Sequence, residues 1–192
     1  MKIYVLGVCG TFMGGLAQLA VQKGFEVAGC DENAYPPMSN VLAEQGIKVD
    51  QGFTIRNIAD DIDLFVIGNV VSRGNPMMEE ILKRRLKFVS GPQFLTESIL
   101  EDRHVIAVSG THGKTSTSSM LAKVLIDAGL DIGYMIAGRA IDLDSTAYLG
   151  TDKYFVIEAD EYDTAFFDKR SKFIHYSPCL LYTSPSPRDR VQ

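Results

Sequence analysis

The sequence predicts an α/β protein with mostly parallel sheets, and three observations support this. Apolar runs typical of buried strands alternate along the chain with segments whose apolar residues recur at helical spacing. Two of these runs lead directly into glycine-rich turns, and a third ends in a cluster of acidic residues. The 192 residues suffice for one domain and most of a second, because a domain usually takes roughly 100–200 residues.

The first domain is expected over residues 1–101, up to a charged stretch that precedes a new strand. A strand at residues 2–6, a glycine-rich turn, a helix over about 13–23 and a strand ending at Asp31 form a β-turn-α-β unit. Such a unit predicts a Rossmann-like domain. The other elements expected here are a helix capped by Ser39, strands near residues 47–49 and 64–67, and a helix that begins at Pro76.

The second domain is expected over residues 102–178 and is of the P-loop α/β type. A buried strand at residues 105–108 enters the turn at residues 110–115, and a helix follows up to Ala128. Another buried strand at residues 154–157 ends in the acidic residues 158–163. A strand, a glycine-containing loop and a helix in this order are the context that a phosphate-binding loop requires.

This loop has the chemistry to hold a nucleotide. Backbone N–H groups at a helix N-terminus bind phosphate, because the helix dipole favours an anion there. Lys114 supplies a positive charge, and Thr115 offers a hydroxyl to Mg²⁺. The standard motif has glycine where Val108 stands. The candidate ATP-binding residues are Gly110, Thr111, His112, Gly113, Lys114, Thr115 and Ser116. We expect His112 to shape the loop rather than to act in catalysis.

The acidic residues after the strand at 154–157 are candidates for holding Mg²⁺. A metal–phosphate site needs a carboxylate near the loop, and ligands bind at the carboxyl ends of parallel strands. Asp160, Glu161 and Asp163 have a weaker claim than the first acid of the cluster, because clustered acids are more often solvated than catalytic.

The first glycine-rich turn, residues 7–15, has the spacing G-x-x-G-x-x-x-G rather than the dinucleotide-binding G-x-G-x-x-G. Asp31 stands where a ribose hydroxyl would be bound, but aspartate is also a common turn-forming residue, so both roles stay open. An NAD-dependent enzyme is the rival interpretation. It does not explain why a second phosphate loop follows one domain later.

Several of these segments resemble the Mur ligase family, which makes bacterial peptidoglycan precursors. The resemblance rests on residues 7–17, 69–76 and 158–176 and on the loop variant Gly-Thr-x-Gly-Lys-Thr, and it covers about residues 1–178. It implies ATP and Mg²⁺ as cofactors, with Lys114 and Glu158 as catalytic residues and Thr115 and Glu158 as metal ligands. It also implies a UDP-binding first domain whose sugar-nucleotide site consists of Gly7, Gly10, Thr11, Phe12, Met13, Gly14, Asp31 and Ser72.

The resemblance implies a ligase that forms an amide bond. ATP would phosphorylate the lactyl carboxylate of UDP-N-acetylmuramate, and an amine would attack the resulting acyl phosphate. Tyr162 and residues 166–170 favour the branch that adds the murein tripeptide L-alanyl-γ-D-glutamyl-meso-diaminopimelate in peptidoglycan recycling. Two alternatives stay open, namely the branch that adds L-alanine and a non-catalytic module that binds a UDP-sugar or a nucleotide.

Residues 179–192 are expected to be a non-native tail, because residues 179–189 look like the translation of an adapter used in DNA library preparation. Family members continue past His175 and Tyr176 with a further strand end and a third domain. We therefore expect an incomplete ATP-binding domain and a chain that is inactive as a ligase by itself.

Charge and hydropathy argue against two classes of partner. The net charge is −5 and no basic stripe is present, so nucleic acid is not an expected partner. The densest basic run, residues 83–85, is expected on a solvated helix face. No stretch approaches the ~20 apolar residues of a membrane span. We expect a cytoplasmic bacterial protein.

Overall fold

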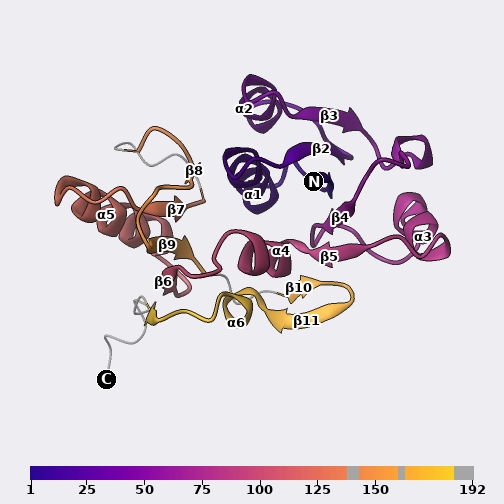
Figure 1. Ribbon diagram of the computed structural model, residues 1–192. Coiled ribbons are helices and arrows are strands. Elements are labelled where there is room, and N and C mark those ends of the chain that lie inside the picture. The colour runs from indigo at the N-terminus through magenta and orange to yellow at the C-terminus, as the bar shows by residue number, and fades with distance from the viewer. Residues whose placement is uncertain (138–142, 160–162, 184–192) are drawn as a thin grey trace.

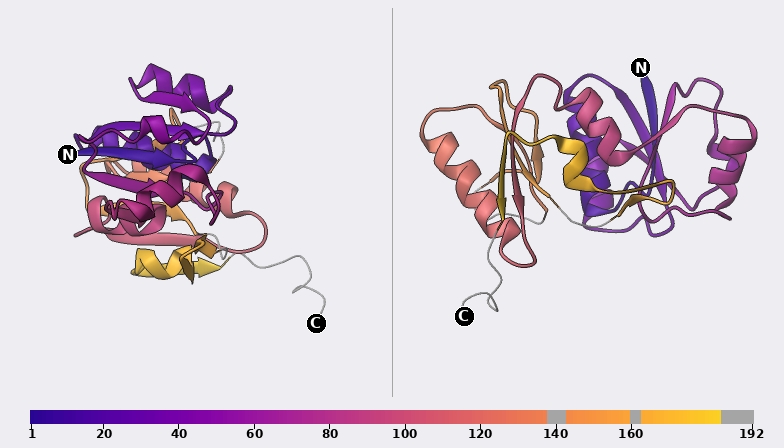
Figure 2. Two further views of the ribbon diagram at one scale, coloured as in Figure 1. Left: turned by 90° about the vertical axis from the view of Figure 1, so that its right-hand side faces the viewer. Right: turned by 90° about the horizontal axis from the view of Figure 1, so that it is seen from below.

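The computed structural model describes residues 1–137, 143–159 and 163–183. Two five-stranded sheets lie on either side of a shared layer that contains α1 (Thr11–Gln22) and α4 (Gly91–Ser98) (Figure 1). The outer face of the first sheet is covered by α3 (Pro76–Lys83), and that of the second by α5 (Lys114–Asp127) (Figure 2). This arrangement of helices on parallel sheets confirms the predicted α/β class.

The first sheet has the strand order β3-β2-β1-β4-β5, and every neighbouring pair is parallel. This is the order of a Rossmann-like sheet, whose ligands bind where the order reverses, between β1 and β4. The glycine-rich turn follows β1 and therefore lies at that point. The strands are β1 (Lys2–Leu6), β2 (Glu26–Asp31), β3 (Lys48–Gln51), β4 (Leu64–Ile67) and β5 (Phe88–Ser90).

The helices of the first sheet follow from local sequence signals in most cases. Asn75 caps α3, accepting hydrogen bonds from the backbone of Met77 and Met78, and Pro76 occupies the first helical position as predicted. The prediction that Ser39 caps a helix was wrong. The helix α2 (Met38–Glu44) has Pro37 at its cap position, since proline's fixed φ suits a helix start. A 3₁₀ turn at Ile55–Asn57 was not predicted.

The second sheet has the order β12-β6-β9-β7-β8. Its strands are parallel except for β8, which runs antiparallel to β7. The phosphate loop follows β6, and the strand that ends at Glu158 is the direct neighbour of β6. The strands are β6 (His104–Ser109), β7 (Gly133–Met135), β8 (Ala147–Tyr148), β9 (Tyr154–Glu158) and β12 (Leu180–Thr183).

One apolar core joins the two sheets through α1. Leu16 and Leu19 of this helix are fully buried in the same cluster as Phe155 and Ile157 of the second sheet. The side-chain amide of Gln22 adds polar contacts, donating to the Ala147 carbonyl oxygen at 3.2 Å and accepting from the Leu149 N–H at 2.7 Å. The helix that begins at the glycine-rich turn is therefore packed directly on the second sheet.

A hairpin of β10 (Asp163–Ala165) and β11 (Asp168–Ser171), followed by α6 (Lys172–Tyr176), returns from the second sheet to the first. It lies below β5 in Figure 1. The ring of Phe167 packs edge-on against Phe88 of β5, with 5.1 Å between centroids. Thr96 of α4 donates a 2.8 Å hydrogen bond to the carbonyl oxygen of His175. The chain that leaves the Glu158 strand is thus anchored on the first sheet.

The segment expected to be a non-native tail is described in part. Leu180 to Thr183 form the edge strand β12, which pairs in parallel with β6, and all four side chains are exposed. Residues 184–192 lie outside the described residues. The proposed boundary at residue 178, like the boundary at 101, stays a prediction.

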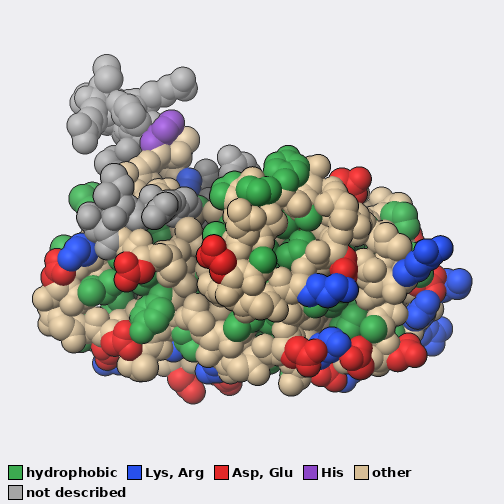
Figure 3. All heavy atoms as spheres, turned by 90° about the horizontal axis from the view of Figure 1, so that it is seen from above, with side chains coloured by type: hydrophobic (Ala, Val, Ile, Leu, Met, Phe, Trp, Pro, Cys, Tyr) green, Lys and Arg blue, Asp and Glu red, His purple; other side chains and the backbone are tan. Residues whose placement is uncertain are grey.

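The basic run at residues 83–85 lies at the C-terminal end of α3 and is exposed. Lys and Arg side chains gather at this end of the molecule among Asp and Glu side chains (Figure 3). Lys83 and Arg84 both pair with Glu80 on the same helix. Among the residues that the structure describes, no helix has the length and apolar character needed to cross a membrane.

Candidate functional site

The first glycine-rich turn connects β1 to α1 beside β2. The backbone N–H groups of Gly7 and Val8 donate to the carbonyl oxygen of Cys30, at 2.8 and 3.2 Å. Gly10 precedes the first helical residue in an extended conformation. The amides of Thr11, Phe12 and Met13 belong to the first helical turn, where N–H groups point out of the helix end and can bind an anion. The turn therefore has the local geometry of an anion-binding site.

Three residues assigned to the UDP-sugar site have evident structural roles. Asp31 accepts hydrogen bonds from the Cys9 and Asn33 N–H groups at 2.9 and 3.2 Å, which is the turn-forming role. The side chain of Met13 is 4% exposed and belongs to the core, so it would offer a ligand only its backbone. A β-carbon at Gly14 would lie 2.5 Å from the Met38 sulfur, so a larger residue there would displace the Met38 side chain. Ser72 is exposed in the loop after β4.

The phosphate loop joins β6 to α5 with two glycines in conformations that other residues rarely adopt. Gly110 has φ 131° and Gly113, directly before the helix, has φ 78°. The Lys114 ammonium donates to the carbonyl oxygen of Gly110 at 2.6 Å and so spans the loop. Exposed residues form the rest of this surface, namely Thr111, His112, Gly113, Thr115 and Ser116.

Glu158 lies beside this loop at the carboxyl end of β9. It is in register with Val108 of β6, and the next residue's N–H donates to the Val108 carbonyl oxygen at 2.9 Å. The side chain is half-buried. Asp160 and Glu161 lie outside the described residues, as does the side chain of Asp163. Of the acids in this cluster, Glu158 is the one whose side chain the structure describes.

A small pocket of about 80 Å³ brings Glu158 together with the first glycine-rich turn. Thr11 and Phe12 reach it from the start of α1, and Glu158 reaches it from the second sheet. The remaining lining residues are Met135, Ile136, Ala137 and Thr146. Candidate residues that the sequence assigns to separate domains, Glu158 and the pair Thr11 and Phe12, therefore line one pocket.

The loop residues fit a nucleotide and a hard divalent cation. Two left-handed glycines, a helix N-terminus and an ammonium make a cradle for phosphate. The structure describes no cluster of three or more His, Cys, Asp or Glu side chains that could hold a metal ion. Such a cluster is not required for Mg²⁺, which keeps several waters and usually takes one or two carboxylates plus phosphate oxygens. Thr115 and Glu158 suit that role.

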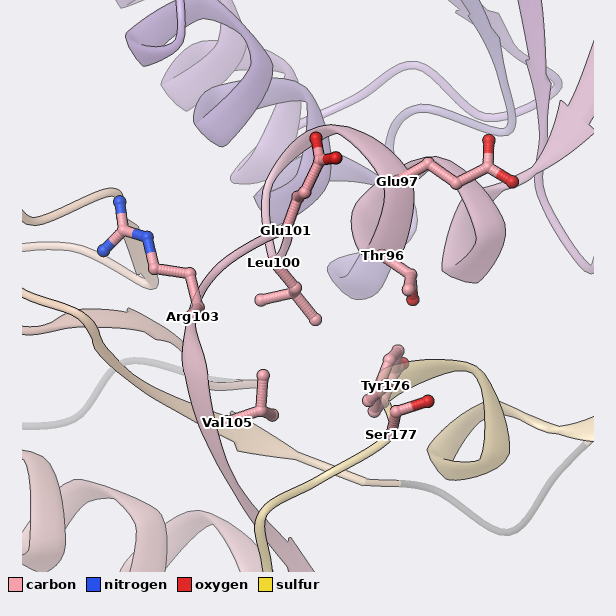
Figure 4. A pocket seen from close by; sticks show the side chains of 8 residues that line it. All are labelled: Thr96, Glu97, Leu100, Glu101, Arg103, Val105, Tyr176 and Ser177. Atoms are coloured by element: carbon pink, nitrogen blue, oxygen red, sulfur yellow. The ribbon is translucent and has the colours of Figure 1, made fainter.

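A larger pocket than this one, about 370 Å³, lies elsewhere. It opens between α4, the first half of β6 and the end of α6 (Figure 4). Val105, near the start of β6, lines it, whereas the phosphate loop follows the other end of that strand. Arg103 points toward neighbouring loops, where it donates to the carbonyl oxygens of Asp152 and Gly150. This pocket is separate from the loop chemistry.

Sequence reasoning missed a charged cluster in the segment after Glu158. The Nε2 atom of His175 lies 2.8 Å from Oδ2 of Asp168, and both side chains are almost completely buried. Arg170 donates to both carboxylate oxygens of Asp168, at 2.9 and 2.7 Å. These hydrogen bonds, assisted by the charges of Arg170 and His175, lower the pKa of Asp168 to about 2. The single acid Asp168, followed by the basic residues Lys169, Arg170, Lys172 and His175, was the available signal.

Replacing Asp168 with asparagine is expected to lower the free energy of unfolding by about 1–2 kcal/mol at pH 7. A carboxylate whose pKa is depressed on folding stabilises above its unfolded pKa, near 4, and this contribution disappears as pH falls toward 2. The difference between wild type and Asp168→Asn should therefore be constant above pH 5 and shrink below pH 4. Urea unfolding between pH 3 and 7 measures it, and an equal difference at both ends would contradict the assignment.

Comparison with known proteins agrees with these features. A family model described as "Mur ligase family, catalytic domain" matches residues 2–103. The chain is 53% identical over 179 residues to the UDP-N-acetylmuramate–L-alanyl-γ-D-glutamyl-meso-2,6-diaminoheptandioate ligase of Haemophilus influenzae, which covers 93% of this chain and 40% of that protein. It is 52% identical over 181 residues to the ligase of the same name from Escherichia coli, covering 94% of this chain and 40% of the relative.

A solved structure gives the same result. The crystal structure of the UDP-N-acetylmuramate:L-alanyl-γ-D-glutamyl-meso-diaminopimelate ligase from Neisseria meningitides has a TM-score of 0.92 and 46% identity, covering 100% of this chain and 63% of that chain. The chain spans about 40% of the length of the curated relatives that it matches. The phosphate loop, the parallel sheets and the family match together confirm the resemblance found in the sequence, and the chain belongs to the Mur ligase family.

Proposed function

We propose that this chain carries the sugar-nucleotide and ATP sites of a ligase that joins UDP-N-acetylmuramate to L-alanyl-γ-D-glutamyl-meso-diaminopimelate. The observation that carries the proposal is the pocket in which Glu158 meets Thr11 and Phe12. A reaction between a bound sugar nucleotide and ATP requires the two sites to face one another. The names of the relatives at 52–53% identity support the choice of tripeptide.

Each residue has a definable task in this proposal. The first-turn amides of α1 would bind an anionic group of the UDP-sugar. Lys114 and the first-turn amides of α5 would hold the ATP phosphates, with Thr115 and Glu158 oriented toward Mg²⁺. When bound, ATP supplies the phosphoryl group and Mg²⁺ neutralises charge as that group moves. ATP and UDP-linked precursors are cytoplasmic metabolites, so the proposal places the reaction in the bacterial cytoplasm.

The chemistry follows from bringing these groups together. The lactyl carboxylate of the muramate is a poor acyl donor until it is phosphorylated. Transfer of the γ-phosphoryl group from ATP makes an acyl phosphate and releases ADP. The α-amine of the peptide then attacks the carbonyl carbon, and phosphate leaves and the amine loses a proton as the amide forms. Lys114 would contribute most where negative charge spreads over the transferred phosphoryl group.

The full-length protein tests the proposal directly. It should release phosphate from ATP and form UDP-N-acetylmuramoyl-tripeptide when given UDP-N-acetylmuramate, Mg²⁺ and the tripeptide. L-alanine in place of the tripeptide should give no product. Product with L-alanine alone would favour the other branch of the family. Binding of both nucleotides without any product would favour a non-catalytic module.

A further inference from the structure

Lys172 is a buried lysine that has no role in the reaction proposed above. It is the first residue of α6 and is 6% exposed. Burying an ammonium is costly unless favourable contacts compensate. Its Nζ atom lies 4.9 Å from the centroid of the Phe12 ring, within the range of a cation–π interaction. The lysine comes from the segment that follows Glu158, whereas the ring belongs to the first glycine-rich turn.

The Phe12 ring packs closely against the start of α4. Gly91, the first residue of α4, lies so close that a β-carbon there would come within 3.0 Å of a ring carbon. The ring also lines the pocket that contains Glu158. The ring therefore forms part of the pocket wall, and the Lys172 ammonium lies over it.

Lys172 is itself held by several contacts. The preceding hairpin packs on the first sheet through Phe167 and Phe88. The last turn of α6 is tied to α4 by the hydrogen bond from Thr96 to the His175 carbonyl oxygen. The buried His175–Asp168 pair connects α6 to β11. These contacts fix the position of the helix that presents the ammonium to the ring.

We propose that Lys172 is a positioning residue, which holds the Phe12 ring in the orientation required to bind the UDP-sugar opposite Glu158. This inference rests on the proposed function. Lys172 is not proposed to contact the substrate, because it acts only by orienting the Phe12 ring. It predicts that loss of the lysine weakens sugar-nucleotide binding while ATP binding and kcat change little.

The experiment compares variants of the full-length protein by calorimetric titration of UDP-N-acetylmuramate and of ATP with Mg²⁺. Lys172→Met keeps the apolar stem and removes the charge, and Lys172→Arg keeps a cation that stacks well on aromatic rings. Lys153→Met is the control for a cation–ring contact outside the pocket, because the exposed Lys153 lies 5.1 Å from the Tyr154 ring, just before β9 and at the opposite end of that strand from Glu158. Lys172→Met is also combined with Phe12→Leu, because Lys172 has no aromatic ring to orient when residue 12 is leucine.

Lys172→Met should raise the Kd for UDP-N-acetylmuramate about ten-fold, as expected for a desolvated cation–π contact. Lys172→Arg should stay within about three-fold of wild type, Lys153→Met should be neutral, and the effect should vanish in the Phe12→Leu background. If Lys172→Met does not fold, Lys172→Gln replaces it.

If the Kd of Lys172→Met for UDP-N-acetylmuramate lies within two-fold of the wild-type value, this inference alone is overturned. The same holds if Lys172→Met raises that Kd equally in the wild-type and Phe12→Leu backgrounds. A wild-type protein that binds no UDP-N-acetylmuramate would overturn the proposed function as well.

Discussion

Lys114→Ala is expected to weaken binding of ATP with Mg²⁺ by about 100-fold or more and to abolish measurable ligation. The ammonium spans the loop through its contact with the Gly110 carbonyl oxygen, so it belongs to the segment that is proposed to hold the phosphates. Removing it takes away the positive charge that offsets the anionic phosphates, and alanine leaves no donor in its place. Titration of a non-hydrolysable ATP analogue and the rate of phosphate release measure the two effects.

Lys123→Ala is the control for this change. Lys123 lies on the same helix, pairs with Asp127 on the exposed surface, and is more than two turns away from the loop. Its loss should leave ATP binding within about two-fold, because exposed ion pairs contribute little. Lys114→Ala should still bind UDP-N-acetylmuramate. Unchanged ATP binding by Lys114→Ala would contradict the assignment of the phosphate loop.

The parts of the fold that could be predicted are those whose signals are local. A strand, a glycine-rich turn and a helix are contiguous at residues 2–22 and again at 104–127, and both units were predicted within a few residues. The strand that ends at Glu158 was recognisable as a buried apolar run. Short elements were missed, such as β7 and β8, because two or three residues carry no periodicity. The helix α4 was also missed, although Ser90 caps it.

The candidate site was predictable in composition but not in assembly. Phosphate binding could be predicted from the motif around Lys114, because the residues of this motif are adjacent in sequence. Nothing local indicates that Glu158 shares a pocket with Thr11 and Phe12, more than a hundred residues away. That proximity depends on how α1 packs between the two sheets. The contact of Lys172 with the Phe12 ring could not be predicted for the same reason, since Phe12 lies at the start of α1, far away in the sequence.

Structural roles also limit what a motif can be taken to show. Glycines of the first turn and Asp31 at the end of β2 were assigned to a UDP-sugar on the basis of resemblance. Asp31 organises the turn itself, and Gly14 packs closely against the Met38 side chain. Both residues would be constrained by packing even without a ligand. Their part in binding stays a prediction, and the calorimetric titrations described above would test it.

Glu158→Gln is expected to lower kcat by about 100-fold or more and to raise the Mg²⁺ concentration needed for half-maximal rate. Glutamine keeps the shape of the side chain but removes the negative charge that attracts the cation. The carboxylate is half-buried at the end of β9, where a neutral amide costs less to bury. Melting temperature should therefore stay the same or rise while activity falls, as is usual for residues kept for function at the expense of stability.

The Mg²⁺ dependence separates a metal-binding role from a merely structural one. Steady-state rates of the Glu158→Gln variant should recover partly at high Mg²⁺, since the phosphates and Thr115 would still offer ligands. Glu97→Gln on α4 is the matched control and should leave both the rate and the Mg²⁺ dependence unchanged, because this residue lines the separate pocket. Wild-type rates at low Mg²⁺ for Glu158→Gln would contradict the assignment of Glu158 to the Mg²⁺ site. The acids that follow it in the sequence would then be the remaining candidates for holding the metal.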